Sequence, residues 1–268
     1  MDFQVKVRGM VIGSSNVGEY DKRIIVLTLE RGKITVFAKG ARKPKSPHVA
    51  ATAPFTFGTF TVYEGKEAYS LIDVDVEEYF MDIRNDLSSI YYGLYFCELT
   101  DYFVKENQRE ANMLKLLYRS VQILCANVIC APLVRNIFEI KMLMLNGEGY
   151  ITYECACCHK NGTENTKDGQ GDNSNGAPDK VQNFRLVGIS HKAGGAVCAD
   201  CVGKYDDVME LSQAALYAIN YIYASPVEKV YSFTLTDEVT RELARFSKKY
   251  MARFVDRKFN SLEMLKNA

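Results

Sequence analysis

Four cysteines at the two ends of one segment have the residue type and the spacing of a metal site. Each end carries a C-x-x-C pair, and the members of the two pairs are Cys155, Cys158, Cys198 and Cys201. Two such pairs supply four thiolates, the number that a tetrahedral zinc ion takes at a closed structural site. The sequence therefore predicts one structural zinc ion (Zn2+), with no open coordination position for catalysis.

The distance between the two pairs is unusual for such a motif. Cys158 and Cys198 are separated by 39 residues, whereas about 15–20 is usual. Residues 161–180 read NGTENTKDGQGDNSNGAPDK and contain almost no apolar side chain. We expect them to form a flexible, solvated excursion, because lengthening a polar loop has a small entropic cost.

Other interpretations of the cysteines remain open. Disulfides are disfavoured because the first residues, which include Lys6 and Arg8, form no apolar secretory signal. A redox dithiol would begin a helix after a strand, but Cys155 leads into a polar loop. Cys157 or His159 could also replace one member of the first pair as a ligand.

Composition indicates a globular protein with a core of its own. The chain has 268 residues, of which 47% are hydrophobic, and its 33 cationic residues balance 33 acidic ones. No apolar run reaches the roughly 18 residues of a membrane span. Three further cysteines lie in apolar helical patterns and are expected to be buried thiols: Cys97, Cys125 and Cys130. We therefore expect a reducing, cytoplasmic (nucleoid-associated) location and no membrane.

The first 80 residues have the pattern of a small β-barrel. Five runs rich in β-branched and apolar residues occur there, at 5–12, 24–29, 34–38, 55–63 and 67–76. Five strands in so short a stretch leave no room for long helices. An OB-fold is the predicted architecture, and an SH3-like barrel or a small sandwich is the competing assignment.

The remaining residues have a helical pattern. Apolar residues recur every three or four positions from residue 85, with Asp86 as the expected N-cap. Further helices are expected at 110–129, 132–147, 212–224 and 236–259, and a strand at 184–189. The predicted fold class is α+β, with an OB-fold domain at 1–80 and a helical domain at 81–268. A zinc-ribbon-like segment at 150–205 belongs to the second domain.

A basic segment lies inside this neutral chain. Residues 22–45 hold eight cations and one acid, Glu30. A basic loop between two strands can place ammonium and guanidinium groups on a phosphate backbone. The alternative is a solvated face. The candidate DNA-binding residues are Lys22, Arg23, Lys33, Lys39, Arg42, Lys43 and Lys45.

Aromatic residues of the same region allow two interpretations. OB-fold proteins use aromatic rings as stacking platforms for bases, but a small barrel also needs large side chains inside. The residues concerned are Phe37, Phe55, Phe57, Phe60 and Tyr63.

Sequence patterns of catalysis are absent. The chain contains neither a phosphate-binding G-x-x-x-x-G-K-[ST] loop nor H-E-x-x-H. An acidic cluster could serve a nuclease only if its carboxylates converged on a metal ion, and a solvated boundary is the preferred interpretation of Asp73, Asp75, Glu77 and Glu78. We therefore expect that the protein is not an enzyme.

Several segments in one order carry a family resemblance. They begin with RGMVI at residue 8 and KGARK at residue 39, and continue with FEIKMLMLNG at residue 138 and GGAVCADC at residue 194. In this order, together with the first cysteine pair, they resemble the bacterial recombination mediator family RecO. The excursion at 161–180 and the additional Cys157 depart from the family pattern.

The resemblance implies a function without catalysis. It implies binding to single- and double-stranded DNA, annealing of complementary strands, and loading of RecA with RecR and RecF onto DNA coated by single-strand-binding protein (SSB). It also implies contact between the helical domain and the C-terminal tail of SSB. By charge alone, the candidates for that contact are Arg245, Lys248, Lys249 and Arg253, but an exposed, solvated helix face is the preferred interpretation of these residues. A zinc-ribbon scaffold that binds only proteins, or a hydrolase with an unrecognised site, are the alternatives.

Overall fold

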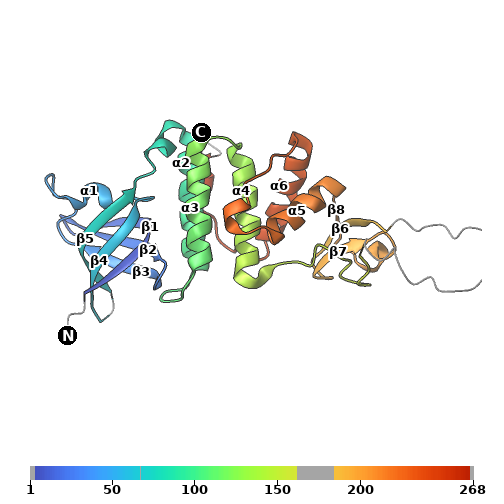
Figure 1. The fold of residues 1–268 in the computed structure, drawn as a ribbon, viewed down its shortest axis with the longest axis horizontal. Helices are drawn as coiled ribbons and strands as arrows, with labels where there is room; N and C mark the ends of the chain where they lie inside the picture. The colour runs from blue at the N-terminus through green and yellow to red at the C-terminus, as the bar shows by residue number, and fades with distance from the viewer. Residues whose placement is uncertain (1–3, 67, 162–183, 266–268) are drawn as a thin grey trace, which may run out of the picture.

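A β-barrel and the cysteine segment occupy opposite ends of an elongated molecule, and helices fill the space between them (Figure 1). This computed structural model describes residues 4–66, 68–161 and 184–265. Apart from residue 161, the predicted excursion at 161–180 therefore lies outside the described residues.

Five strands form the closed barrel in the order β1-β2-β3-β5-β4. Neighbouring strands are antiparallel except β3 and β5, which are parallel. This arrangement confirms the predicted OB-like barrel over its competitors. The strands are β1 Gln4–Val17, β2 Asp21–Thr28, β3 Gly32–Ala38, β4 Phe57–Glu64 and β5 Tyr69–Glu78, and the short helix α1 His48–Ala51 connects β3 to β4.

The long strand β1 closes the barrel because it pairs with two neighbours. Its first half pairs with β4 and its second half with β2. The backbones approach closely at Gly9, where a Cβ atom would lie 2.2 Å from the carbonyl oxygen of Leu27. Any larger residue at this position would separate β1 from β2.

The barrel has an interior core and an exterior apolar face. Alternation along the strands directs nine buried side chains inward: Val7, Val11, Ile24, Val26, Ile34, Val36, Phe60, Val62 and Tyr69. On the exterior, Met10, Ile12 and Leu27 pack into the main core of the helical region. Because the barrel and the helices share this core, the domain division at residue 80 stays a prediction.

Six α-helices follow the barrel in the described part of the chain. They are α2 Leu87–Phe103, α3 Ala111–Ala126, α4 Ala131–Leu143, α5 Gln213–Ala224, α6 Asp237–Met251 and α7 Asn260–Leu265, with shorter turns η1 Met81–Asn85, η2 Met144–Glu148, η3 Val202–Lys204 and η4 Val227–Lys229. Asp86 caps α2 as predicted, because its carboxylate accepts a hydrogen bond of 2.8 Å from the amide of Ser89.

The cysteine segment forms a small sheet in the order β7-β6-β8. Its strands are β6 Leu186–Ser190, β7 Gly195–Cys198 and β8 Met209–Glu210. The strand predicted at 184–189 is therefore present, shifted slightly towards the C-terminus. Together with the helices, this sheet and the barrel confirm the α+β fold class.

Several local predictions were wrong. The helix predicted at 236–259 ends at Met251. A helix that continued to residue 259 would place Arg257 on its buried face. The guanidinium of Arg257 instead lies 4.9 Å from the centroid of the Tyr102 ring. Cys130 is exposed because it is the extended N-cap residue of α4 and lies outside the apolar face of the helix. The fourth strand begins at Phe57, since Phe55 has a φ of +72° that no regular strand accommodates.

One buried carboxylate joins three helices. Glu139 of α4 accepts hydrogen bonds from Tyr95 of α2 at 2.6 Å and Arg135 of α4 at 2.7 Å, and one from Ser247 of α6. Burial and the negative charge of Glu139 raise the pKa of Tyr95, so its hydroxyl remains a donor. These three donors have a hydrogen-bond acceptor only while the Glu139 carboxylate is present.

We expect Glu139→Ala to lower the free energy of unfolding by about 2–4 kcal/mol, because it leaves buried donors and a half-buried guanidinium without an acceptor. Glu139→Gln keeps one acceptor and should have a smaller effect. Urea unfolding followed by circular dichroism measures both. Equal stability of the Ala variant and the wild type would contradict this role for Glu139.

Candidate metal centre and nucleic-acid interface

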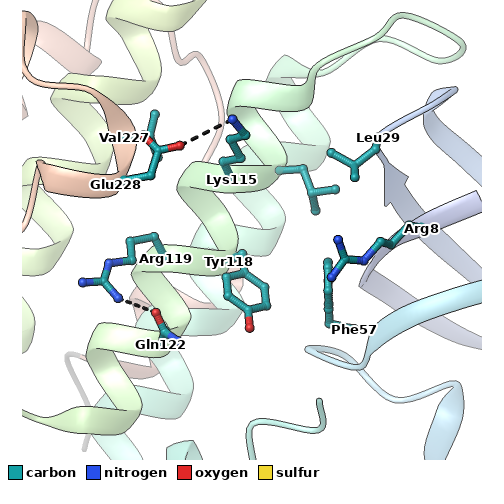
Figure 2. Close-up of a pocket in the computed structure, with 10 residues that line it drawn as sticks. Arg8, Leu29, Phe57, Lys115, Tyr118, Arg119, Gln122, Val227 and Glu228 are labelled. Atoms are coloured by element: carbon teal, nitrogen blue, oxygen red, sulfur yellow. Dashed lines mark hydrogen bonds and ion pairs between the residues drawn. The ribbon is translucent and has the colours of Figure 1, made fainter. Parts of the chain in front are cut away.

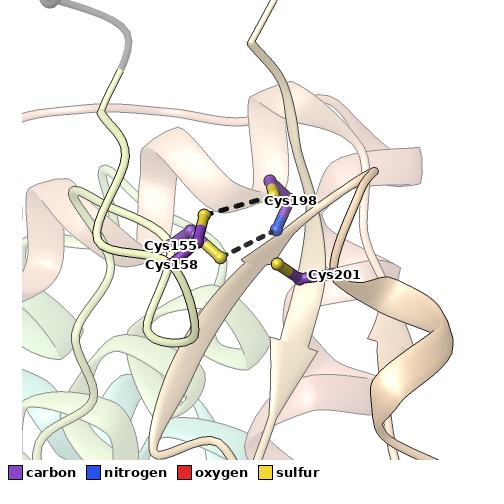
Figure 3. Close-up of side chains that lie close together, drawn as sticks. All are labelled: Cys155, Cys158, Cys198 and Cys201. Atoms are coloured by element: carbon purple, nitrogen blue, oxygen red, sulfur yellow. Dashed lines mark hydrogen bonds between the residues drawn. The ribbon is translucent and has the colours of Figure 1, made fainter.

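Two turns bring the predicted cysteine ligands face to face (Figure 3). In the second turn, the amide of Cys201 donates to the carbonyl of Cys198 at 3.0 Å. The first turn is held against β7, because the amide of Ala156 donates to the carbonyl of Ala196, and the amide of Ala196 to that of Ile151, each at 2.7 Å. These backbone bonds position both pairs despite their separation in the sequence.

The sulfur positions suit a tetrahedral ion. The ligand atoms of Cys155, Cys158, Cys198 and Cys201 lie within 4.8 Å of one another. The sulfurs of Cys158 and Cys198 are 3.8 Å apart, and zinc–sulfur bonds of about 2.3 Å place tetrahedral ligands about 3.8 Å apart. Three of the four side chains are buried and Cys158 is half-buried. This group could therefore hold one metal ion.

The electrostatics of the group also favour a cation. Burial raises the pKa of Cys155, but backbone amides, among them those of Cys158 and Cys198, outweigh burial and lower its pKa to about 6. Burial and the neighbouring thiols raise the pKa of Cys201. Four adjacent thiolates repel one another, so a dication is needed to hold all of them deprotonated.

The two alternative ligands are not among the four that converge, although the Cys157 thiol also contacts the Cys201 thiol. Cys157 directs its sulfur towards Lys204, 3.6 Å from the ammonium nitrogen. His159 pairs with Glu154 at 3.0 Å, and its side chain is 67% exposed. The structure therefore brings together the two pairs with equal spacing and leaves Cys157 and His159 aside.

The basic loop at 39–46 is fixed against the turn between β1 and β2. The carboxylate of Asp21 accepts a hydrogen bond of 2.7 Å from the amide of Gly40. The amide of Arg42 donates to the carbonyl of Tyr20 at 2.9 Å. A loop held in one shape loses less conformational entropy when it binds a ligand.

Six of the seven predicted DNA-binding cations gather at this end of the barrel. Lys22 of β2 pairs with Ala38 of β3, and the loop follows directly. Five of the six side chains are exposed, and Lys22 is half-buried. Within the described residues, no carboxylate forms a salt bridge with any of them. The six are Lys22, Arg23, Lys39, Arg42, Lys43 and Lys45.

Lys33, the seventh predicted cation, has a different environment. Its ammonium nitrogen lies 3.0 Å from the carboxylate and 2.7 Å from the carbonyl of Asp101, at the junction of the barrel and α2. Only 14% of its side chain is exposed. Its charge serves the contact between barrel and helix.

Three of the five aromatic candidates belong to the core. Phe55, Phe57 and Phe60 are at most 7% exposed, so they are not available as stacking platforms. The sequence could not separate them from exposed rings, because alternation in this region is interrupted by the bend at Phe55.

Phe37 and Tyr63 lie on the outside of the barrel and are 37% and 48% exposed. Phe37 pairs with Arg23 across β2 and β3, and with Ser70 across β3 and β5; Ser70 in turn pairs with Tyr63. Directly opposed residues share one face of a sheet. The two rings and Arg23 therefore form one outer row beside the basic loop.

Sequence reasoning missed Tyr20 as part of this surface. Its ring is 45% exposed, and the ammonium nitrogen of Lys43 lies 5.7 Å from the ring centroid. The available signal was an aromatic residue in an otherwise polar turn, outside the alternation of the strands.

The acidic cluster on β5 does not assemble a metal site. Asp73, Asp75, Glu77 and Glu78 are exposed, and Glu77 forms a salt bridge with Arg8. Among the residues that the structure describes, the four cysteines are the one group of potential ligands that converges. The cluster fits the solvated boundary expected from the sequence.

A cleft lies where the barrel, α3 and the η4 turn meet (Figure 2). It has a volume of about 440 Å³, with apolar walls that include Phe57, Leu114 and Val227. Arg8 and Lys115 line it but are paired with Glu77 and Glu228, respectively. No sequence motif indicated this cleft, because it arises only where distant segments pack together.

Arg119 is the cation in this cleft without a carboxylate partner among the described residues. One of its terminal nitrogens donates to the side chain of Gln122, and its buried Nε has no hydrogen-bond partner within the described part of the chain. The cleft thus combines apolar walls with a guanidinium that is available to an anion.

Within the described ranges, every helix is too short or too polar to span a bilayer. Comparison with known proteins gives matches along nearly the whole chain. The family model "Recombination protein O N terminal" matches residues 1–80, and "Recombination protein O C terminal" matches residues 84–263.

Proteins of similar length show the same relationship. The DNA repair protein RecO of Acetivibrio thermocellus is 29% identical over 262 residues, which are 98% of this chain and 96% of that protein. RecO of Clostridium kluyveri is 28% identical, over 98% of this chain and 93% of its own length. RecO of Clostridium perfringens strain 13 is 29% identical, over 96% of each chain. The barrel, the helical region and the cysteine group, with both family models, show that the chain belongs to the recombination protein O (RecO) family of DNA repair proteins.

Proposed function

We propose that the protein mediates recombinational DNA repair by binding single- and double-stranded DNA and annealing complementary single strands. With RecR, and in contact with RecF, it helps to load RecA onto DNA coated by SSB. No covalent bond is made or broken in this role, so we propose that the protein is not an enzyme. The observation that carries the proposal is the fixed basic loop beside an outer row of aromatic rings.

The charges of the loop suit a phosphate backbone. Exposed cations without carboxylate partners can replace the counterions of DNA, whose release favours binding. Annealing requires two polyanions to approach each other, and neutralisation by the loop reduces their repulsion. Lys33 is omitted from the proposed DNA-binding set because Asp101 already neutralises it.

The aromatic row suits unpaired bases. A base stacked on an exposed ring contributes about 1–3 kcal/mol regardless of its identity. Phe37 and Tyr63 are separated by the small Ser70 on the intervening strand, and Arg23 adjoins Phe37. We propose that this row holds single strands while the loop contacts their phosphates.

We propose that the cleft between barrel and α3 binds the acidic C-terminal tail of SSB. Apolar walls favour burial of a peptide side chain, and Arg119 has donors that no carboxylate satisfies within the described residues. Peptide carboxylates form strong charge-assisted hydrogen bonds with guanidinium groups. This arrangement would place an SSB-bound strand close to the barrel.

We propose that the four cysteines hold one structural zinc ion. Four thiolates select zinc by their softness and tetrahedral arrangement. When bound, the ion would neutralise the thiolates and hold the turn at 155–158 to β7. The closed shell leaves it no role in catalysis.

Annealing of two complementary labelled oligonucleotides tests the proposed DNA-binding surface. We expect the wild type to accelerate annealing without nucleotide, on bare and on SSB-coated strands. Arg42→Glu combined with Lys43→Glu should slow annealing about tenfold or more and lower the salt slope of single-strand binding by about 1.4, because two phosphate contacts are lost. Fluorescence energy transfer and anisotropy measure these quantities.

A matched control variant has the same change of net charge, but at positions outside the basic loop. Lys105→Glu combined with Lys258→Glu alters two exposed cations and should leave annealing unchanged. Full activity of the loop variant would remove the loop from the DNA site. A folded, metal-containing wild type that accelerates nothing would favour the protein-binding scaffold.

Metal analysis and thermal unfolding test the proposed zinc ion. We expect one zinc ion per chain by mass spectrometry of metals. Cys198→Ser should lower the zinc content and reduce Tm by roughly 5–10 °C, because the ion stabilises the segment. Cys157→Ser should change neither. Unchanged melting after complete removal of the metal would contradict a structural role.

A labelled peptide that has the sequence of the SSB tail tests the proposed role of the cleft. Arg119→Gln should weaken binding about tenfold, because a charge-assisted hydrogen bond is lost. Arg84→Gln, an exposed arginine on η1, is the control and should bind normally. Equal affinity of both variants would place the tail elsewhere.

A further inference from the structure

A row of cations covers the solvent face of α6. Arg241, Arg245, Lys248 and Lys249 are exposed, while Leu243 and other apolar residues of the helix are buried. The acid within this stretch, Glu242, is turned away and accepts a hydrogen bond of 2.7 Å from the amide of Ser212. The exposed face is therefore positive from Arg241 to Lys249, whereas the first turn carries the exposed acids Asp237 and Glu238.

The cations of this row are spaced at regular intervals, as the charges of an anionic polymer are. A helix rises 1.5 Å per residue, so Arg241, Arg245 and Lys249 follow one another at intervals of about 6 Å along one face. The row extends over about 12 Å. A single terminal carboxylate needs one or two cations, whereas a phosphate backbone presents charges along its whole length.

The row borders a cleft against the cysteine segment. Arg245 and Lys249 line this cleft from α6, and Arg185 lines it from the segment that leads into β6. Its volume is about 790 Å³. Cations on two sides of one open cleft can contact an anionic chain from both sides.

Backbone carbonyls hold these cations without neutralising them. Arg245 donates to the carbonyl of Glu210 at 3.0 Å, and Lys249 donates to the carbonyl of Asp207 at 3.2 Å. The carboxylate of Asp207 instead accepts hydrogen bonds from Ser190 and the amide of Lys192. No carboxylate in the described ranges forms a salt bridge with the α6 cations. Glu210 is the acidic residue that lines the cleft.

We infer that α6 and Arg185 form a second binding track for a nucleic-acid phosphate backbone. The track lies towards the cysteine-segment end of the molecule, far from the basic loop (Figure 1). One molecule can therefore hold two nucleic-acid segments at once. This inference rests on the proposed DNA-binding function and adds a second site to it.

The test is a bridging assay with two oligonucleotides of the same, non-complementary sequence, poly-dT. One is immobilised on beads and the other is fluorescent and free. Wild-type protein is expected to capture the free strand on the beads. Arg245→Gln combined with Lys249→Gln keeps side-chain donors for the two carbonyls but removes both charges. This variant should capture at least fivefold less, and its salt slope for single-strand binding should fall by about 1.4.

The control Lys105→Gln combined with Lys258→Gln removes two exposed charges outside the track and should bridge normally. Zinc content and Tm of both variants should match the wild type. Undiminished bridging by the α6 variant would overturn the inference, as would single-strand binding by the wild type without bridging. Loss of SSB-tail peptide binding without loss of bridging would also overturn it, because the surface would then bind protein. Absence of any DNA binding by the wild type would overturn the proposed function as well.

Discussion

The packing of the barrel's exterior against α2 and α3 is the constraint on which the other features depend. The side chains of Met10, Ile12 and Leu27 point away from the barrel interior and pack into the helical core. The ion pair between Lys33 and Asp101 lies at the same junction. This contact leaves the loop end of the barrel open to solvent and creates the cleft beside α3. A barrel free to rotate against the helices would have neither property.

Segregation of charge gives a neutral chain two basic surfaces. Its 33 cations and 33 acids cancel in sum, but the cations of the loop and of α6 lack carboxylate partners among the described residues. Acids are concentrated elsewhere, for example along β5. The neutral chain as a whole therefore gives little long-range attraction to a polyanion, whereas each basic surface would attract phosphates at short range. Such a protein would bind and release strands without the trapping that a uniformly basic surface produces.

Local signals predicted the elements, and tertiary packing decided the roles of individual residues. The C-x-x-C spacing, the strand alternation and the Asp86 cap depend on neighbours in the sequence, and each led to the observed structure. The environment of Lys33 depends on Asp101, 68 residues away, which no local pattern reveals. The burial of Phe57 and the end of α6 at Met251 were likewise decided by contacts with other elements. The two clefts could not be predicted because distant segments form their walls.

The cysteine group matters to the proposed second track through the sheet that it anchors. Cys198 ends β7, β7 pairs with β6, and β6 pairs with β8. Arg185 directly precedes β6, and Glu210, whose carbonyl holds Arg245, belongs to β8. The sheet therefore sets the distance between Arg185 and the cations of α6. A metal ion held by the four cysteines would in this way set the width of the cleft, and so contribute indirectly to the proposed second track.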